Sequence, residues 1–263
     1  MSERVHTQPL PADQVARQST LDRAPNGLRY ATWGETRIAP SELVHIVGAV
    51  PTSVAAALTR TAWYFVPLAI SARETAGHRS TAPDATLVAP DSTEELAEQA
   101  ICHRNVAFRD ADATFISARL LPDRFALAFE LFINVGHAFV DAAGVPESFA
   151  ELVWTQALAD ARGETSQDAW ESRLEAFENR AARSGDLLRI NEKARLAYLE
   201  AAFSDAIAVY LLSLTLDFSY SELREREYPL LAPQPLAERL RAIHALFPPN
   251  PGYEFSIRYR RRA

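Results

Sequence analysis

The segment from Phe125 to Asp141 constrains the fold most, because it is apolar at nearly every position. A helix that is apolar all round is normally buried in the core of a protein. The segment Leu121-Pro122-Asp123 offers a helix start before it, and Gly144 and Pro146 end a helix at about Ala143. The sequence therefore predicts a long central helix that ends there and is surrounded by the rest of the fold.

Four polar side chains interrupt this helix on one face: Glu130, Asn134, His137 and Asp141. Glu130, His137 and Asp141 are spaced by seven and four residues, and Asn134 lies within a turn of their line. Burying a Glu, a His and an Asp costs free energy unless they form hydrogen bonds or bind a metal. Three interpretations stay open: a satisfied internal network, a metal site, and the wall of a solvated groove.

A second long helix is predicted over residues 191–216, with Asp205 as its candidate site residue. Asp205 lies seven residues after Tyr198 and four after Ala201, so the three share a line along the helix. Glu200 lies about 140° from Asp205 around the axis, at about 100° per residue. Glu200 should therefore point elsewhere.

Both helices resemble the catalytic core of the lethal-factor-like zinc metallopeptidases, a zincin family. In that family the core helix carries His-Glu-x-Gly-His, and here the five positions read Ile133-Asn134-Val135-Gly136-His137. The helix from Tyr198 to Tyr210 is similar to the family's Glu-x-Phe-Ala-Glu-Ala-Phe segment. The resemblance covers residues 41–220. It implies a zincin-like α+β fold with a small mixed sheet packed on two long core helices, and with extended N- and C-terminal arms.

Residue by residue, the resemblance puts the family's first zinc histidine at Ile133, its general-base glutamate at Asn134 and its second zinc histidine at His137. The third ligand falls on Ala201, and the acid that supports it falls on Asp205. A catalytic zinc needs three protein ligands and an open water position. An amide has no basic carboxylate to take a proton from metal-bound water. The resemblance thus implies no catalytic residues, three degenerate positions (Ile133, Asn134 and Ala201) and a vestigial polar site (Glu130, His137, Asp141 and Asp205).

A rearranged metal site is the alternative hypothesis. Glu130, His137, Asp141 and Asp205 could form an oxygen-rich cluster for another divalent metal, with His137, Glu130 and Asp205 as the ligands. The chain would then be a metal-dependent hydrolase, a peptidase, with its site around His137. Purified protein would hold stoichiometric metal that is lost on His137→Ala. The first hypothesis expects no metal and no cofactor.

Composition limits the classes of partner. A net charge of −7 and a sequence pI near 5.5 argue against a general affinity for nucleic acid or for anionic membranes. There is no uncharged apolar run of 18 residues and no apolar signal core near the start, so no membrane insertion is expected. The single Cys102 excludes an internal disulfide framework. These features predict a cytoplasmic location.

The two ends of the chain differ from its middle. Residues 1–40 are polar and Pro-containing without a sustained period, which predicts an extended N-terminal arm. Residues 41–225 would form the zincin-like pseudopeptidase domain. Residues 226–263 would form a Pro/Arg-rich C-terminal extension, with one short helix over 235–246 and a strand-like stretch over 253–257.

Other elements follow from local patterns. Helices are predicted after Pro51 and over residues 147–161 and 166–183, and strands over 66–70 and 86–88. A hairpin is predicted from residues 106–108 and 114–117. His103, beside Cys102, is predicted to be structural. The charge run from Asp168 to Glu178 is predicted to be a solvated helix face.

We therefore expect a catalytically inactive metallopeptidase-like protein, a pseudoenzyme that serves as a binding or structural subunit, or scaffold, of a larger protein assembly. Protein partners would bind through the terminal arms or the groove. A zincin groove presents a sheet edge, so strand addition is the expected mode of protein binding. A regulator that binds a small ligand in the vacated pocket is a further hypothesis.

Overall fold

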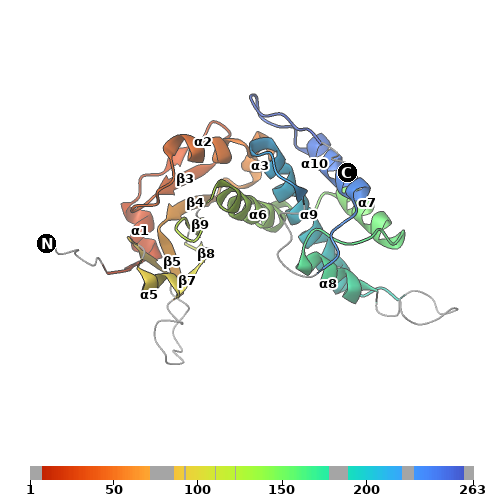
Figure 1. The fold of residues 1–263 in the computed structure, drawn as a ribbon, viewed down its shortest axis with the longest axis horizontal. Coiled ribbons are helices and arrows are strands. Elements are labelled where there is room, and N and C mark those ends of the chain that lie inside the picture. The colour runs from red at the N-terminus through yellow and green to blue at the C-terminus, as the bar shows by residue number, and fades with distance from the viewer. Residues whose placement is uncertain are drawn as a thin grey trace. The chain divides into compact units, whose positions relative to one another are not determined.

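The computed structural model describes residues 8–71, 86–91, 93–109, 111–121, 123–177, 189–220 and 228–257 (Figure 1). The chain divides into two compact units, Met1–Leu131 and Phe132–Ala263. The boundary falls inside one helix, α6 (Arg124–Ala143), so each unit contains a part of it. The chain is mixed α+β, as predicted, but this division differs from the predicted single domain over residues 41–225.

The first unit contains a mixed five-stranded sheet with the strand order β2-β3-β4-β9-β8. The inner strands β3, β4 and β9 are parallel, and β2 and β8 pair antiparallel at the two edges. All residues of β4 except the first are buried, which is typical of a strand covered on both faces. The strands are β2 (Asp22–Arg23), β3 (Arg29–Thr32), β4 (Thr61–Val66), β8 (His103–Ala107) and β9 (Asp112–Ser117).

A smaller antiparallel sheet in the same unit has the strand order β1-β6-β5-β7. Ser117, at the end of β9, links it to the larger sheet. The Ser117 Oγ accepts a hydrogen bond from Ala69 N at 2.8 Å and donates one to Ile101 O at 2.5 Å. The strands are β1 (Leu10–Pro11), β5 (Leu68–Ser71), β6 (Thr86–Ala89) and β7 (Ala100–Ile101).

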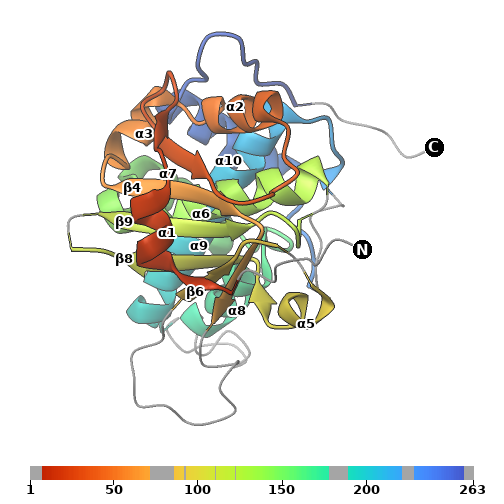
Figure 2. The ribbon, with the colours of Figure 1, turned by 90° about the vertical axis from the view of Figure 1, so that its left-hand side faces the viewer.

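Short helices cover this unit, and α1 lies across one face of the larger sheet (Figure 2). Val15 of α1 belongs to the same buried cluster as Tyr64 and Phe115, whose rings stack 4.8 Å apart. The Thr93 hydroxyl caps α5 by accepting a hydrogen bond from Leu96 N. The helices are α1 (Ala12–Gln18), α2 (Pro40–Gly48), α3 (Thr52–Ala57) and α5 (Glu94–Ala97).

The predicted extended N-terminal arm over residues 1–40 is wrong for its described part. From Leu10 onward the chain forms β1, α1, β2 and β3, all paired or packed within the first unit. Val15 and Ala31 are fully or almost fully buried. Two-residue strands have no period that a sequence can show, because other strands supply their hydrogen-bond partners. Residues 1–7 lie outside the described part.

The second unit is helical and is organised around α9 (Glu192–Thr215), which packs against its other helices. Asn191 caps α9 through the Ala194 N–H, and Ser166 caps α8 through the Ala169 N–H. A Cβ on Gly136 would lie 2.7 Å from Ser204 O, so glycine allows α6 and α9 to cross closely. The other helices are α7 (Glu147–Leu158), α8 (Gln167–Ala176) and α10 (Pro233–Leu246).

The C-terminal extension is part of the second unit. Its helix α10 packs against α7 and α9 and buries Leu236, Leu240 and Ile243. Residues 253–257 form no strand, contrary to the strand-like prediction. The Arg-rich residues 258–262 lie outside the described part.

The predictions of the long helices and of the hairpin are confirmed, the latter by the pairing of β8 with β9. The helix predicted over residues 166–183 ends earlier, at Ala176, since Phe177 forms an isolated bridge with Ile190. The helix after Pro51 ends at Ala57, and the aromatic residues Trp63 and Phe65 that follow it belong to β4. Trp63, Tyr64 and Phe65 form a continuous apolar run, and a short run of this kind is compatible with either a helix or a buried strand.

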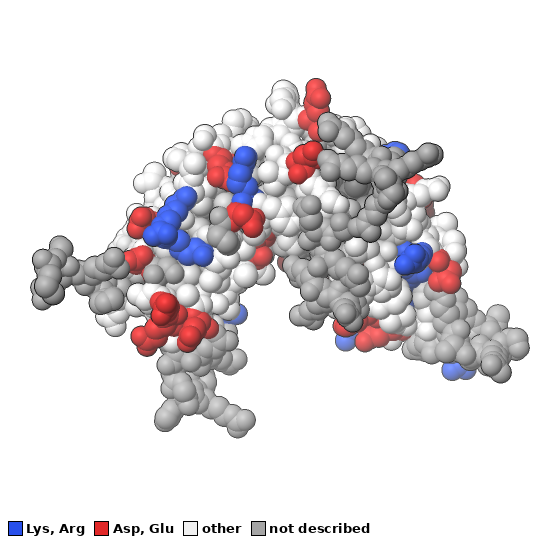
Figure 3. Space-filling view, viewed as in Figure 1, with Lys and Arg blue, Asp and Glu red and all other residues white. Residues whose placement is uncertain are grey.

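Charged side chains of both signs are scattered over the face in Figure 3, and acidic ones gather over α5. Glu94, Glu95 and Glu98 are exposed there. By length and composition alone, α6 and α9 could each cross a membrane, and their most apolar stretches are 44% and 67% buried. Core helices meet the same criterion, so this is weak evidence for a membrane.

Candidate functional site

The polar stripe of α6 is only partly buried. Asn134 is 3% exposed and Ile133 is half-buried, whereas His137 and Asp141 are exposed. The expectation that this helix is surrounded by the rest of the fold is therefore wrong for the face that carries His137 and Asp141.

Glu130 has a partner that the sequence did not suggest. The Glu130 Oε1 lies 2.5 Å from Nδ1 of His103 on β8, within the first unit. This contact attaches the first part of α6 to an edge strand. It agrees with the prediction that His103 is structural.

On α9, Ala201 is half-buried and Asp205 is 8% exposed. The Asp205 Oδ2 accepts a hydrogen bond from Thr165 Oγ1 at 2.7 Å. Among the residues that the structure describes, no group of three or more His, Cys, Asp and Glu side chains could hold a metal ion. The candidate ligands His137, Glu130 and Asp205 thus form no such group.

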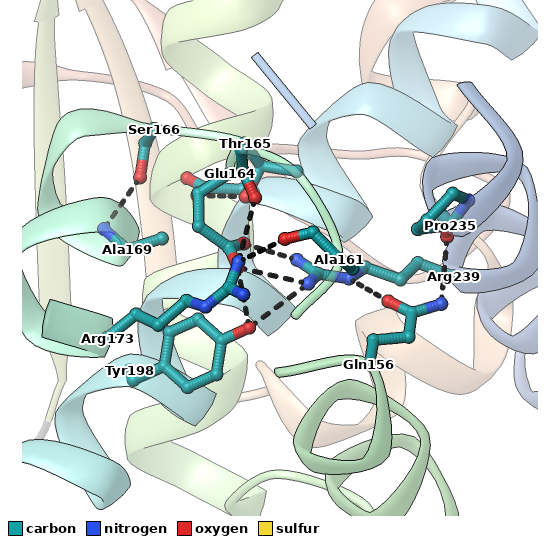
Figure 4. Close-up of polar contacts among 12 residues, drawn as sticks. Gln156, Ala161, Glu164, Thr165, Ser166, Ala169, Arg173, Tyr198, Pro235 and Arg239 are labelled. Atoms are coloured by element: carbon teal, nitrogen blue, oxygen red, sulfur yellow. Dashed lines mark hydrogen bonds and ion pairs between the residues drawn. The ribbon is translucent and has the colours of Figure 1, made fainter. Parts of the chain in front are cut away.

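Within the part of the chain that the structure describes, a buried polar cluster is centred on Glu164, in the loop between α7 and α8 (Figure 4). Glu164 is 0% exposed. Its Oε1 accepts hydrogen bonds from Arg173 Nη1 at 2.9 Å and from Tyr198 Oη at 2.7 Å. Its Oε2 accepts one from Arg239 Nη1 at 2.9 Å. Residues from α8, α9 and α10 therefore converge on one carboxylate.

Arg239 extends this cluster to α7. Its Nε donates to Gln156 Oε1 at 2.9 Å, and its Nη2 donates to Tyr198 Oη at 3.1 Å. Gln156 Nε2 in turn donates to Glu238 Oε2 at 2.9 Å and to Pro235 O at 3.2 Å. The guanidinium of Arg239 is fully buried and is satisfied by side chains of three elements.

The backbone around Glu164 is also fixed. Glu164 N donates to Pro229 O, and Leu231 N donates to Glu164 O, each at 2.9 Å. Gly163 precedes it with φ +79°, and a Cβ there would lie 2.1 Å from Leu230 O. Only glycine fits this position, because the backbone is left-handed and two chain segments touch. The loop is thus held by the segment before α10.

Asp205 and Thr165 adjoin this cluster. Burial raises the pKa of the Asp205 carboxyl to about 6, although hydrogen bonds from Ser166 and Thr165 and the charge of Arg239 favour the ionised form. Burial, followed by the charges of Tyr228 and Asp205, raises the pKa of the Tyr220 hydroxyl, and the Tyr220 Oη has no hydrogen-bond partner among the residues that the structure describes.

The electrostatics of the cluster favour charged Arg239 and neutral Tyr198. Burial alone would lower the pKa of Arg239, but the charge of Glu164 and the contacts with Tyr198 outweigh it, so the pKa is raised. Burial raises the pKa of Tyr198. Arg173 has a further ion pair with the exposed Asp160, at 3.5 Å. Three side chains, one from each of three helices, donate hydrogen bonds to the Glu164 carboxylate, so we interpret the cluster as a structural link between these helices.

The sequence reasoning missed Glu164, Arg173 and Arg239. Arg173 lies in the charge run that was predicted to be a solvated face, yet it is 3% exposed. One signal was available: Arg239 is three residues after Leu236 and four before Ile243, which places it on the apolar face of α10.

No protein-family model, no curated protein and no solved structure matches this chain.

Proposed function

We propose that this chain is a non-catalytic protein of zincin-like fold that acts as a binding or structural subunit of a larger protein assembly. The main support for this proposal is the identity of the residues at the positions that correspond to zinc ligands. Ile133 and Ala201 are apolar, and neither can donate a lone pair to a metal. The carboxylate of Asp205 is hydrogen-bonded to Thr165.

The remaining polar positions support the same proposal. His137 is one histidine where the family has two, and Asn134 has an amide in place of the basic carboxylate. Zinc would have to bind with one of its three family ligands, and hydrolysis would lack its base. The loss of both functions together fits a pseudoenzyme.

The zincin-like arrangement draws support from two features. The mixed sheet in the first unit contains β9, and α6 is the next helix along the chain after β9. In the second unit, α9 crosses α6 closely at Gly136 and Ser204. A strand that leads into a long helix, and a second long helix packed across it, are the parts that the resemblance requires.

Binding by strand addition is the mode that we propose. Among the strands that the structure describes, β8 pairs with β9 alone, and we propose that its other edge accepts an extended peptide. The described part of the N-terminal arm is built into the sheets and so is not the attachment that was expected. The groove edge, and the Arg-rich end beyond residue 257, remain the proposed contacts with protein partners.

We place the protein in the cytoplasm, without nucleic acid or membrane insertion. The net charge of −7 opposes binding to polyanions. Cys102 is exposed and is the single cysteine of the sequence, so the sequence holds no internal disulfide, which suits a reducing compartment.

Elemental analysis and a repaired variant test the loss of the metal site. The purified chain should hold no stoichiometric zinc or other divalent metal. The triple variant Ile133→His, Asn134→Glu, Ala201→Glu should bind zinc, because it restores the family's ligands around His137. Zinc binding by Ile133→His alone, as the matched control, should be much weaker. Stoichiometric metal in the unmodified chain that is lost on His137→Ala would favour the hydrolase.

Affinity capture with the full chain tests the binding role. A defined protein partner should be retained, and Asn105→Pro on the edge strand β8 should reduce the retention, because proline disturbs the edge that the peptide would extend. A chain that is monomeric and captures nothing would contradict the proposed role.

A further inference from the structure

The chain reverses direction after α10 and returns along the second unit. Tyr253 N donates a hydrogen bond to Asn250 O at 3.1 Å, which closes a four-residue turn. Pro251 and Gly252 occupy its middle, and Gly252 has φ +92°. Proline followed by a glycine of positive φ is the pattern of a type II turn. The sequence thus fixes this reversal locally, and Figure 2 shows the dark blue segment that arches beyond α10.

Residues 253–257, which we name the strap, are extended but belong to no strand. Their side chains alternate: Tyr253, Phe255 and Ile257 are half-buried, whereas Glu254 and Ser256 are exposed. Alternation of this kind is the pattern of an extended peptide lying on a surface. Side-chain contacts, with no strand pairing, therefore attach the strap to the unit.

Phe255 packs against Tyr210 of α9 and His244 of α10, two residues that we name the aromatic seat. Its ring stacks on the His244 ring with centroids 4.9 Å apart and meets the edge of the Tyr210 ring at 5.2 Å. Tyr210 is 1% exposed, and its hydroxyl donates to Phe247 O at 2.9 Å. Tyr210 is thus fixed by contacts that do not involve the strap. The seat would persist when the strap leaves.

The strap is attached by fewer buried side chains than helix α10. Helix α10 is bound through the buried Arg239 and a row of buried apolar residues, so its loss requires unfolding of the unit. The strap has three half-buried side chains and two exposed ones. Segments with few buried contacts open locally at a small fraction of the global free energy of unfolding.

We propose that the strap occupies, in cis, a peptide-binding site on α9 and α10. An extended peptide of a protein partner, with an aromatic residue at the position of Phe255 and polar neighbours, takes this seat when the strap opens. The inference rests on the proposed function in treating the chain as a binding protein, and it adds a site and a class of peptide. It is independent of the β8 edge.

A labelled synthetic peptide with the sequence of residues 250–257 tests the site on the full chain. The unmodified chain should bind the peptide weakly, because its own strap competes. Phe255→Ala in the full chain should bind it at least ~10-fold more tightly, since a less populated closed state leaves more of the seat available. Glu254→Ala, which changes an exposed strap residue, is the matched control and should bind like the unmodified chain.

Two further variants locate the binding. The peptide with Ala at the Phe255 position should not bind to Phe255→Ala protein. His244→Ala combined with Phe255→Ala should lose the gain in affinity while the circular dichroism spectrum is retained. Equal binding by the unmodified chain and Phe255→Ala, or binding unaffected by His244→Ala, would overturn the proposal.

Hydrogen exchange on the unmodified chain provides a readout that needs no variant. Strap amides should exchange at least ~100-fold faster than the amides of α10, because the strap opens without unfolding the unit. Exchange of the strap together with α10 would overturn the proposal. If peptide binding fails but affinity capture through β8 succeeds, the strap site alone is wrong. If the peptide binds but no partner is captured, the assembly role alone is wrong.

Discussion

Tyr198 and Asp205 lie two turns apart on one face of α9 and form hydrogen bonds to two consecutive residues, Glu164 and Thr165. One helix face thus fixes one loop at two points. Arg239 reaches the same loop from α10, and Arg173 reaches it from α8. This loop joins helices of the second unit, and three of the predictions that follow concern this unit.

Removing Arg239 should destabilise the protein severely. Arg239→Met leaves the buried Glu164 carboxylate with Arg173 and Tyr198 only, and breaking a buried ion pair on one side costs about 3–5 kcal/mol. The free energy of unfolding, measured in urea, should fall by that amount. Arg241→Ala, two residues away and exposed, is the matched control and should change it by less than about 0.5 kcal/mol.

Asp205 should make the second unit more stable in mild acid. Its pKa rises from 3.8 to about 6 on folding, so the folded state binds the proton more tightly than the unfolded state does. The free energy of unfolding should therefore rise, by about 2 kcal/mol from this residue, as the pH falls from 7 to 4. The benefit is complete below the unfolded pKa and lost as the pH rises through 6.

Asp205→Asn isolates this contribution, because an amide does not titrate and can still accept the hydrogen bond from Thr165. The difference in unfolding free energy between the variant and the unmodified chain should change with pH over this window. Asp141→Asn, which alters an exposed carboxylate, should retain the pH dependence of the unmodified chain. An identical pH dependence of Asp205→Asn and the unmodified chain would show that Asp205 is not the titrating group.

Two glycines of positive φ should respond differently to alanine. Gly163→Ala adds a Cβ 2.1 Å from Leu230 O, so the loop and the segment before α10 must separate. Gly144→Ala meets nothing within 4 Å and carries only the strain of a left-handed backbone, about 1 kcal/mol. Thermal unfolding should show a clearly larger loss for Gly163→Ala, and equal losses would contradict the close approach.

The contact between His103 and Glu130 should contribute little to stability. The His103 side chain is 39% exposed, and exposed pairs are worth about 0–1 kcal/mol. Glu130→Gln should lower the free energy of unfolding of the chain by no more than that and should leave its metal content unchanged. A loss of bound metal on Glu130→Gln would instead support the rearranged site.

The sequence predicted the long helices because their apolar surface repeats locally. The segment Phe125–Asp141 and the stretch around Tyr198 and Asp205 each contain enough turns for the period to show. The sequence predicts the shared face of Tyr198 and Asp205 in the same way, and the structure shows that this face contacts Glu164 and Thr165.

The buried polar cluster around Glu164 could not be predicted in this way, because its members are distant in sequence. Glu164 and Arg239 are 75 residues apart, and nothing near Glu164 indicates that a carboxylate there is buried. The N-terminal strands were missed for a related reason, since a two-residue strand such as β2 is defined by its neighbour β3. The sequence could not decide between burial and exposure of His137 and Asp141, because an apolar helix does not reveal which of its faces is left uncovered.

The most direct test of the central claim is a peptide-library cleavage assay with the purified full chain, supplied with zinc and compared with and without a chelator. We expect no cleavage above background under either condition, because the proposed resemblance puts Ile133, Asn134 and Ala201 at the positions of two zinc ligands and the base. Cleavage that disappears with the chelator, and also on His137→Ala, would contradict it.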